Sequence, residues 1–267
     1  MSAMPSLRSQ NGLLGLHRLW REGRTGLELA ALLRDPIFRR VDPRAGRGRP
    51  VLLVPGFLAP DESLGLLARW LRRSGFHPGG AGMRLNAGCF TAALDALEER
   101  AEALRGATKG RVAIIGQSHG GTLGRSLAAR RPDLVSGVVA MGSPLIDPFA
   151  IHPVARFHVR VVSALGSLGT PGLFSRECLE GECCAEVRRA AERPFPRSVG
   201  FVSVYSRSDG IVDWRACLDP AAEHVEVQAS HIGMAVNAQA YAAIGAALER
   251  FDAGVPRRRK RPAAVPV

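Results

Sequence analysis

Short apolar runs alternate with longer amphipathic stretches over most of the chain, from about residue 50 to residue 251. Several of the apolar runs consist almost entirely of valine, isoleucine and leucine, which is typical of strands covered on both faces of a parallel sheet. The stretches between them repeat apolar residues at helical spacing. Because alternating strands and helices are joined by crossover connections, the pattern predicts an α/β fold with a mostly parallel sheet of about six strands and helices on both faces.

The individual elements can be placed on this pattern. The strands are expected at Val51–Val54, around Phe76–Leu85, and at Val112–Ile115, Val135–Met141, Val199–Tyr205 and His224–Gln228. The helices are expected at Glu62–Arg73, Thr91–Leu104, Gly121–Arg130 and Ala235–Phe251. We expect Asp61 and Thr91 to cap the first two helices, because a short side-chain oxygen can accept a hydrogen bond from a free N–H of the first turn.

An amphipathic segment precedes the first strand. Residues 12–34 place apolar side chains at helical spacing, and Asp35-Pro36 ends the predicted helix. Such a helix can pack on the edge of the sheet, lie on a membrane surface or shape a substrate site. The Gly-Arg-rich linker Asp42–Arg49 follows it. We therefore expect residues 1–48 to form an N-terminal helical extension and residues 49–252 to form the α/β domain.

The stretch from Pro144 to Pro196 interrupts the alternation of strands and helices. It contains six prolines, several large apolar residues and three of the five cysteines. A connection of this length calls for a functional explanation. An apolar cap over a pocket for a hydrophobic substrate is one explanation, and a peripheral excursion of the chain is the alternative. We expect a cap insertion at about residues 144–196.

The run Gly116-Gln117-Ser118-His119-Gly120 joins the third predicted strand to the third predicted helix. A serine presented as a nucleophile has to sit on a very sharp turn, and side chains two positions before and after it would collide with the neighbouring backbone. Glycine at both positions, here Gly116 and Gly120, avoids the collision. The motif in this context predicts that Ser118 is a nucleophile.

Candidates for the base and its carboxylate follow Ser118 in the chain. Asp209 comes directly after the strand Val199–Tyr205, and His231 comes directly after the last predicted strand. Active-site groups of open parallel sheets gather at the carboxyl ends of the strands, and the order Ser, Asp, His is that of a nucleophile-elbow triad. Asp213 is the rival carboxylate, although its position favours a role as a helix cap.

A serine nucleophile also needs two backbone N–H groups that bind the developing oxyanion. The N–H of His119 is one candidate, because it follows the nucleophile at the positive end of a helix. The loop after the first strand supplies the other, with Gly56 allowing a close approach and Phe57 as the expected donor. The side chain of His119 is expected to line the pocket rather than to act as the base.

These stretches together resemble the bacterial α/β-hydrolase fold family, in its lipase/esterase group. The resemblance covers about residues 49–251 and rests on VLLVPGFLAP (51–60), Asn86-Ala87-Gly88, RVAIIGQSHGG (111–121), MGSP (141–144), YSRSDGIVDW (205–214) and SHIGM (230–234). It implies a serine hydrolase that cleaves carboxylic esters through Ser118, Asp209 and His231 and needs no cofactor. The usual His-Gly before the oxyanion donor is Pro55-Gly56 here, which leaves Phe57 and Leu58 as alternative donors.

The resemblance leaves the reaction partly open. A thioesterase, an amidase or an acyltransferase would use the same three residues. A non-catalytic binding protein with this fold is a further alternative, although such proteins usually lack one member of the triad. The expected partner is a small hydrophobic ester.

The net charge of +12 is concentrated at the two ends of the chain. Residues 1–50 carry +6 and residues 251–267 carry +4, so the part between them is nearly neutral. The tail 253–267 is expected to be disordered and to solubilise the protein. Contact of the basic termini with a membrane surface is the alternative, and no specific nucleic-acid partner is expected. No signal peptide or membrane span is apparent, which favours the cytoplasm.

Five cysteines do not form a disulfide framework in a chain of this length. Cys178, Cys183 and Cys184 lack the paired spacing and the nearby fourth ligand of a zinc site, so no metal site is predicted. Small buried thiols are expected instead, with a disulfide inside this group as the alternative. The sequence carries no signal for an oligomeric state.

Overall fold

The computed structural model describes residues 20–183, 185, 189 and 193–252. Within them, six strands form one sheet in the order β2-β1-β3-β4-β5-β6, and every neighbouring pair is parallel. The strands are β1 (Pro50–Val54), β2 (His77–Gly80), β3 (Val112–Gln117), β4 (Val135–Met141), β5 (Gly200–Tyr205) and β6 (Glu223–Glu226). This confirms the predicted parallel sheet of about six strands.

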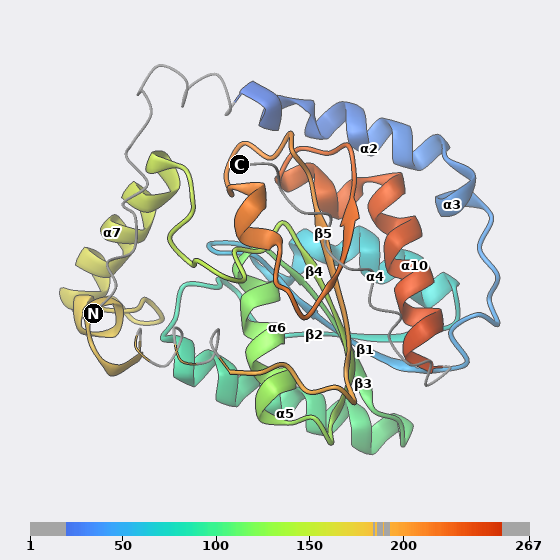
Figure 1. Ribbon diagram of the computed structural model, residues 1–267, viewed down its shortest axis with the longest axis horizontal. Helices are drawn as coiled ribbons and strands as arrows, with labels where there is room; N and C mark the ends of the chain where they lie inside the picture. The colour runs from blue at the N-terminus through green and yellow to red at the C-terminus, as the bar shows by residue number, and fades with distance from the viewer. Residues whose placement is uncertain (1–19, 184, 186–188, 190–192, 253–267) are drawn as a thin grey trace.

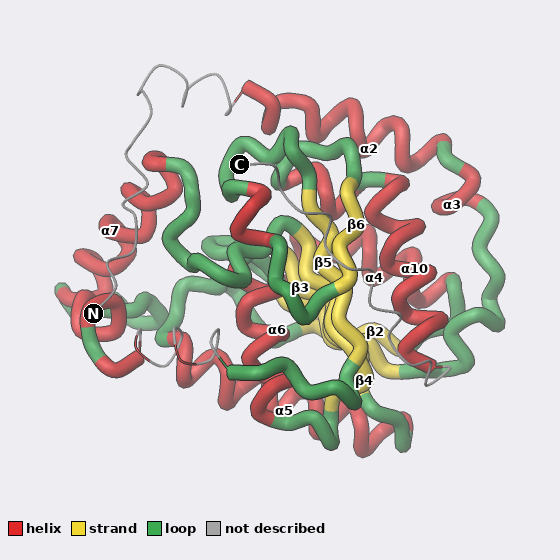
Figure 2. The backbone as a smooth tube through the Cα atoms, viewed as in Figure 1, coloured by secondary structure: helices red, strands yellow, loops and turns green. Residues whose placement is uncertain are grey.

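Helices cover the sheet on both faces (Figure 2). The α-helices are α2 (Thr25–Arg34), α3 (Pro36–Arg39), α4 (Gly65–Arg73), α5 (Phe90–Thr108), α6 (His119–Arg130), α7 (Pro153–Ser167), α8 (Arg176–Glu180) and α10 (Ala238–Asp252). The shorter 3-10 helices are η1 (Trp20–Arg24), η2 (Asp61–Leu64), η3 (Trp214–Cys217) and η4 (Ile232–Val236). None of the helices described here is both long and apolar enough to span a bilayer.

Alternate residues of each central strand enter two separate hydrophobic cores. Val51 and Leu53 of β1 pack with residues of α2, α3, α4 and α10 on one face. Leu52 and Val54 pack with residues of α5 and α6 on the other. Because both faces are buried, every position of β1 must be apolar, which explains the uninterrupted apolar runs in the sequence.

Two of the predicted helix caps are wrong. The Asp61 carboxylate accepts hydrogen bonds from the N–H groups of Gly82 (2.7 Å) and Met83 (3.3 Å), so it fastens the chain after β2 instead of capping its own helix. Helix α5 begins one residue before Thr91, with Cys89 at the N-cap, and it continues to Thr108. Neither side-chain oxygen caps the first turn of its helix. The Asp61 carboxylate pairs with the chain after β2, and the Thr91 hydroxyl lies next to Sγ of Cys89.

The N-terminal segment packs along the outside of the domain. Helix α2 lies against η4 and α10, as Figure 1 shows along the upper edge of the molecule. Leu32 is fully buried there, whereas Trp20 and Leu27 are exposed. Asp35 ends α2, as the Asp-Pro pair predicted, and its side chain also caps α3 by accepting a hydrogen bond from the N–H of Ile37. Residues 1–19 of the predicted extension and the basic tail 253–267 lie outside the described residues.

The connection between β4 and β5 contains α7 and α8, and α7 lies well to one side of the sheet (Figure 1). Several large apolar side chains of this insertion are exposed, among them Phe157, Leu165 and Leu168. Phe174 returns to the domain, where its N–H donates to the carbonyl oxygen of Ala87. The insertion therefore contacts the domain next to the segment that follows β2.

Candidate functional site

Ser118 lies on a strained turn between β3 and α6. Its backbone φ is 52° and its ψ is −124°, a conformation that costs free energy for any residue with a side chain. A Cβ atom on Gly116 would lie 2.4 Å from the backbone of Gly120, and one on Gly120 would lie 2.2 Å from the carbonyl oxygen of Val54. Neither distance is tolerable, so the turn requires glycine at both positions, as the motif predicted.

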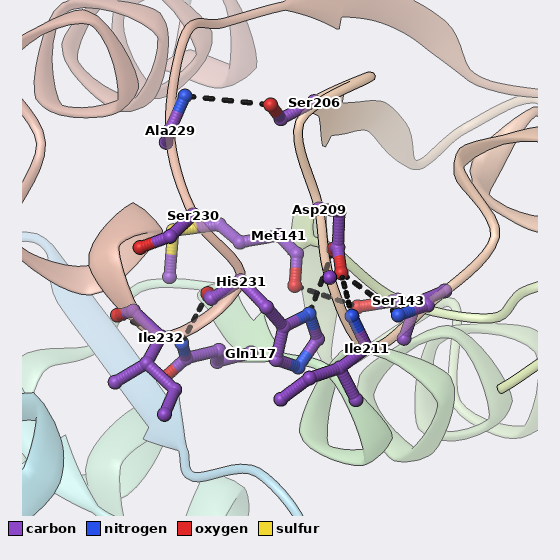
Figure 3. Close-up of polar contacts among 12 residues, drawn as sticks. Gln117, Met141, Ser143, Ser206, Asp209, Ile211, Ala229, Ser230, His231 and Ile232 are labelled. Carbon is purple, nitrogen blue, oxygen red and sulfur yellow. Dashed lines mark hydrogen bonds and ion pairs between the residues drawn. The ribbon is translucent and has the colours of Figure 1, made fainter. Parts of the chain in front are cut away.

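Asp209 and His231 form a buried pair (Figure 3). Nδ1 of His231 lies 2.7 Å from Oδ2 of Asp209. The other carboxylate oxygen of Asp209 accepts hydrogen bonds from the N–H groups of Ile211 and Val212, each at 2.8 Å. These bonds fix the carboxylate, so the histidine ring is oriented with Nε2 pointing away from Asp209 (Figure 3).

The rival carboxylate, Asp213, does not contact His231. It is the N-cap of η3, where its side chain accepts a hydrogen bond from the N–H of Arg215 at 3.0 Å. It also lies 3.5 Å from the Arg215 guanidinium at an exposed position. The structure therefore brings Asp209, and not Asp213, to the histidine.

The end of β4 brings Ser118 and the Asp–His pair to the same edge of the sheet. The N–H of Ser118 donates to the carbonyl oxygen of Met141 at 2.8 Å. A Cβ atom on the next residue, Gly142, would lie 3.1 Å from Nδ1 of His231 and 3.2 Å from Oδ2 of Asp209. The three predicted residues thus gather around the carboxyl ends of β3, β4 and β5, where open parallel sheets place their active sites.

Gln117, the residue before the serine, ties the turn to the histidine loop. Its side-chain Nε2 donates to the carbonyl oxygens of His231 (3.1 Å) and Ile232 (3.4 Å), as Figure 3 shows. The variable position before the serine therefore has a positioning contact of its own. The sequence motif gave no indication of it.

Two glutamates of the N-terminal segment also hold the histidine loop. The Glu22 carboxylate accepts hydrogen bonds from the N–H groups of His231 (2.9 Å), Ile232 (2.9 Å) and Gly210 (3.1 Å). The Glu28 carboxylate accepts from the N–H (2.8 Å) and the hydroxyl (3.1 Å) of Ser230. Glu22 thus bridges the loop that carries His231 and the loop that carries Asp209.

Sequence reasoning missed both glutamates. On an amphipathic helix a glutamate is ordinarily a solvated residue, and the contacts join positions about 200 residues apart. The free N–H groups at the start of η4 are the feature that attracts Glu22, because the first N–H groups of a helix have no partner inside it.

The pKa values of the two histidines of the site are shifted in opposite directions. Burial lowers the pKa of His231, but the charge and hydrogen bond of Asp209 and the charge of Glu22 outweigh burial and raise that pKa above its ordinary value. Burial lowers the pKa of His119 to about 4. His119 is therefore neutral at physiological pH, and its ring lies 6.0 Å from that of Phe90 in the pocket wall.

The loop after β1 lies beside the serine. A Cβ atom on Gly56 would lie 3.4 Å from Cβ of Ser118, so the loop approaches the turn closely. The N–H of Leu58 donates to the carbonyl oxygen of Asn86 at 3.0 Å and is not free for a ligand. No acceptor within the described part of the chain pairs with the N–H of Phe57, which leaves Phe57 as the better of the two donor candidates.

Asn86 is a further residue whose contact the sequence did not reveal. It is buried, and its side chain donates to the carbonyl oxygen of Pro55 at 2.8 Å. Its backbone N–H donates to the carbonyl oxygen of Ala59 at 3.1 Å. Asn86 therefore braces the loop of Phe57 from both sides.

An apolar cavity of about 160 Å³ opens at Ser118. The domain contributes Phe57, Phe90, His119 and Thr122 to its wall. The insertion contributes mostly apolar side chains, namely Pro148, Phe149, Ile151, Val159, Phe174 and Leu179. The rings of Phe57 and Phe174 lie 6.1 Å apart, so the insertion touches the loop beside the serine.

Comparison with known proteins agrees with this architecture. A family model described as the alpha/beta hydrolase fold matches residues 71–159, which include β3, the turn at Ser118 and β4. None of the curated proteins matches the sequence.

Several solved structures share the fold at low sequence identity. The mature lipase of Bacillus licheniformis has a TM-score of 0.60 at 11% identity, over 75% of this chain and 92% of its own. A metagenomic carboxyl esterase has a TM-score of 0.58 at 15% identity, over 78% and 76%. The monoacylglycerol lipase of Paleococcus ferrophilus has a TM-score of 0.53 at 16% identity, over 76% and 94%. From the parallel sheet, the strained turn at Ser118 and these matches, we conclude that this chain is a protein of the α/β-hydrolase fold.

Proposed function

We propose that this protein is a serine hydrolase that cleaves carboxylic esters with hydrophobic acyl groups. The observation that carries the proposal is the buried pair of Asp209 and His231, 2.7 Å apart, beside a serine held at φ 52°. An orienting carboxylate, an imidazole and a serine nucleophile at a strand-to-helix turn are the parts that acyl transfer requires.

In the proposed reaction, Nε2 of His231 takes the proton of the Ser118 hydroxyl while Oγ attacks the ester carbonyl. The backbone N–H groups of Phe57 and His119 bind the oxyanion. The histidine then returns the proton to the leaving alcohol, and an acyl-enzyme remains. Water, deprotonated by the same histidine, releases the acid and restores the serine. No step needs a cofactor.

Asp209 has two roles in the proposed reaction. Its hydrogen bond to Nδ1 selects the tautomer in which Nε2 can accept a proton. Its charge stabilises the imidazolium that forms in the transition state. The same charge raises the pKa of His231 in the free protein. His119, whose pKa is about 4, is a poor candidate for the base.

The wall of the cavity supports a hydrophobic substrate. Its aromatic and aliphatic side chains come from both the domain and the insertion, and they surround Ser118. An acyl chain in this cavity would leave water and contact those side chains. The two lipases and the carboxyl esterase that share the fold lend support at the level of reaction class.

Labelling by a fluorophosphonate probe tests the serine hydrolase assignment directly. The purified protein should react covalently at Ser118, and Ser118→Ala should not react while retaining the wild-type melting temperature. A protein that binds ligands without catalysis would leave the probe unreacted. Comparison of p-nitrophenyl esters with thioesters and amides of the same acyl group then separates the ester hydrolase from the thioesterase and amidase alternatives.

A further inference from the structure

Three cysteines from two distant parts of the chain meet at the junction of insertion and domain. Cys89 precedes α5, Cys178 lies on α8 and Cys183 lies shortly after α8. Their three sulfur atoms all lie within 4.8 Å of one another, and those of Cys89 and Cys183 are 3.2 Å apart. All three side chains are half-buried. The fold, and not the local sequence, creates this cluster.

The spacing suits a metal ion bound by thiolates. Zinc binds thiolate sulfur at about 2.3 Å with tetrahedral geometry, so two sulfurs on one zinc lie roughly 3.8 Å apart. The observed separations, 3.2 Å at the shortest and 4.8 Å at most, bracket this value. A single disulfide would use two of the sulfurs and leave the third one without a role. A metal ion accounts for all three.

Hydroxyl groups next to the cluster can support thiolate ligands. The Thr91 hydroxyl lies 3.1 Å from Sγ of Cys89 and 3.9 Å from Sγ of Cys183. The Ser175 hydroxyl donates to Sγ of Cys178 at 3.7 Å. Hydrogen bonds of this kind orient ligands and stabilise their charge. The expectation that there is no metal site was based on residues 178–184 alone, and it did not include Cys89.

We propose that Cys89, Cys178 and Cys183 bind one Zn²⁺ ion that fastens the insertion to the start of α5. Each ligand binds as a thiolate, so the three thiols together give up to three protons to the solvent when the ion binds. Three protein ligands leave the fourth tetrahedral position to water. None of the three cysteines belongs to the proposed triad, and the ion has no role in the proposed ester cleavage.

The ion also bears on the shape of the cavity. Cys178 and Cys183 line the same cavity as Ser118, together with Leu179 between them. Bound zinc therefore holds one wall of the cavity against the domain. The reaction proposed above does not depend on this site, and the site does not depend on the reaction.

Metal titration of the reduced, metal-free full-length protein tests the proposal. Cobalt, which adopts the same geometry, should bind at one equivalent per chain and give thiolate-to-cobalt charge-transfer absorption, and Zn²⁺ should abolish that absorption by displacing it. Competition with a chelating dye then gives the zinc affinity. Cys89→Ser and Cys178→Ser should each weaken zinc binding at least about 100-fold, because each removes one of three thiolates.

Cys217 provides the matched control. It is fully buried but lies outside the cluster, so Cys217→Ala should bind zinc as the wild type does. Zinc should raise the melting temperature of the wild type and not that of Cys89→Ser. Should the serine variants fail to fold, Cys89→His retains a zinc ligand and should bind cobalt with weaker charge-transfer absorption.

Two results would overturn the proposal. One is the absence of thiolate-to-cobalt absorption in the reduced wild-type protein. The other is zinc binding that Cys89→Ser leaves unchanged. A Cys89–Cys183 disulfide in the purified protein, found by peptide mapping, together with no metal bound after reduction, would assign the cluster to thiol oxidation instead.

Discussion

The carboxylate of Glu22 accepts a hydrogen bond from the backbone N–H of His231 at 2.9 Å. The two residues lie near opposite ends of the chain, and the contact places a negative charge next to the proposed general base. That charge contributes to the raised pKa of His231. The N-terminal helix thereby influences both the position of the base and its protonation.

The Glu22–His231 contact predicts a shift in the pH profile. A base acts in its neutral form, so a raised pKa moves the acidic limb of kcat/KM to higher pH. Glu22→Gln removes the charge but keeps a hydrogen-bond acceptor, and it should therefore move that limb to lower pH. Ester hydrolysis measured from about pH 5 to pH 9 checks this, because the range spans the ordinary histidine pKa. Glu99→Gln, a change at an exposed position on α5, should leave the profile in place.

Glu22→Ala should also cost stability, because it leaves three N–H groups without their charged acceptor. Hydrogen bonds to charged groups contribute roughly 1.5–3 kcal/mol, so we expect the free energy of unfolding to fall by about that amount. Urea unfolding measures the change. An unchanged midpoint would mean that water replaces the carboxylate without loss.

The two aspartates of the acid loop should differ in their effect on catalysis. Asp209→Asn keeps the shape but favours the wrong histidine tautomer, and it should lower kcat by about 10²–10⁴ with little change in melting temperature. Asp213→Asn should leave kcat nearly unchanged, because asparagine is also a good N-cap for η3. Rates measured at one pH near neutrality make the comparison. A larger loss of kcat in Asp213→Asn would contradict the assignment.

The tight turn at Ser118 predicts an effect on stability. A Cβ atom at Gly120 would lie 2.2 Å from a backbone oxygen, so Gly120→Ala should force the backbone apart and lower the free energy of unfolding by several kcal/mol, about 3 or more. Gly106 is the control, because a Cβ there meets nothing within 4 Å on helix α5. Gly106→Ala should raise stability by about 0.5–1 kcal/mol. Thermal unfolding of both variants tests the pair.

The apolar cavity predicts a dependence on acyl length. Each buried methylene contributes roughly 0.8 kcal/mol, so kcat/KM should increase as the acyl chain lengthens from two carbons to about eight. A series of p-nitrophenyl esters gives the profile. Phe174→Ala removes a wall residue of the insertion that also contacts Phe57, and it should reduce the preference for longer chains. A flat profile, or a preference for acetate, would argue against an acyl site here.

The parallel sheet could be predicted, and so could the edge at which Ser118, Asp209 and His231 lie, because each strand and the residues that follow it can be recognised from local sequence. Buried strands of a parallel sheet must be apolar throughout, and their carboxyl ends meet at one edge. The sharp turn at Ser118 can be recognised in the sequence because it requires glycine at positions 116 and 120. The strands and the turn are formed by residues that are neighbours in the chain, and the three site residues were each placed from the strand that precedes them.

The contacts that complete the site depend on residues far apart in the chain. Glu22, Asn86 and Cys89 each act through a partner that the fold brings close. Even for Asn86, which lies in one of the matching stretches, the sequence did not indicate that partner. The wrong prediction of Asp61 as a helix cap has the same cause, a partner that is not visible in the local sequence. Asp61 is an acceptable cap by residue type, but the N–H groups of Gly82 and Met83 compete for its carboxylate. Local residue propensity cannot predict a hydrogen-bond partner that comes from a distant part of the chain.

The contacts of Glu22 and Glu28 also bear on where the protein can be cut. A fragment that starts at residue 49 would contain the whole sheet and all three proposed triad residues, yet it would lack both carboxylates that hold the histidine loop. Since the ribosome makes Glu22 early and His231 late, the loop acquires its support only when synthesis is nearly complete. We therefore expect the smallest unit with the proposed activity to begin ahead of the first strand, and the histidine loop of a nascent chain to be held in place only after Glu22 and Glu28 have contacted it.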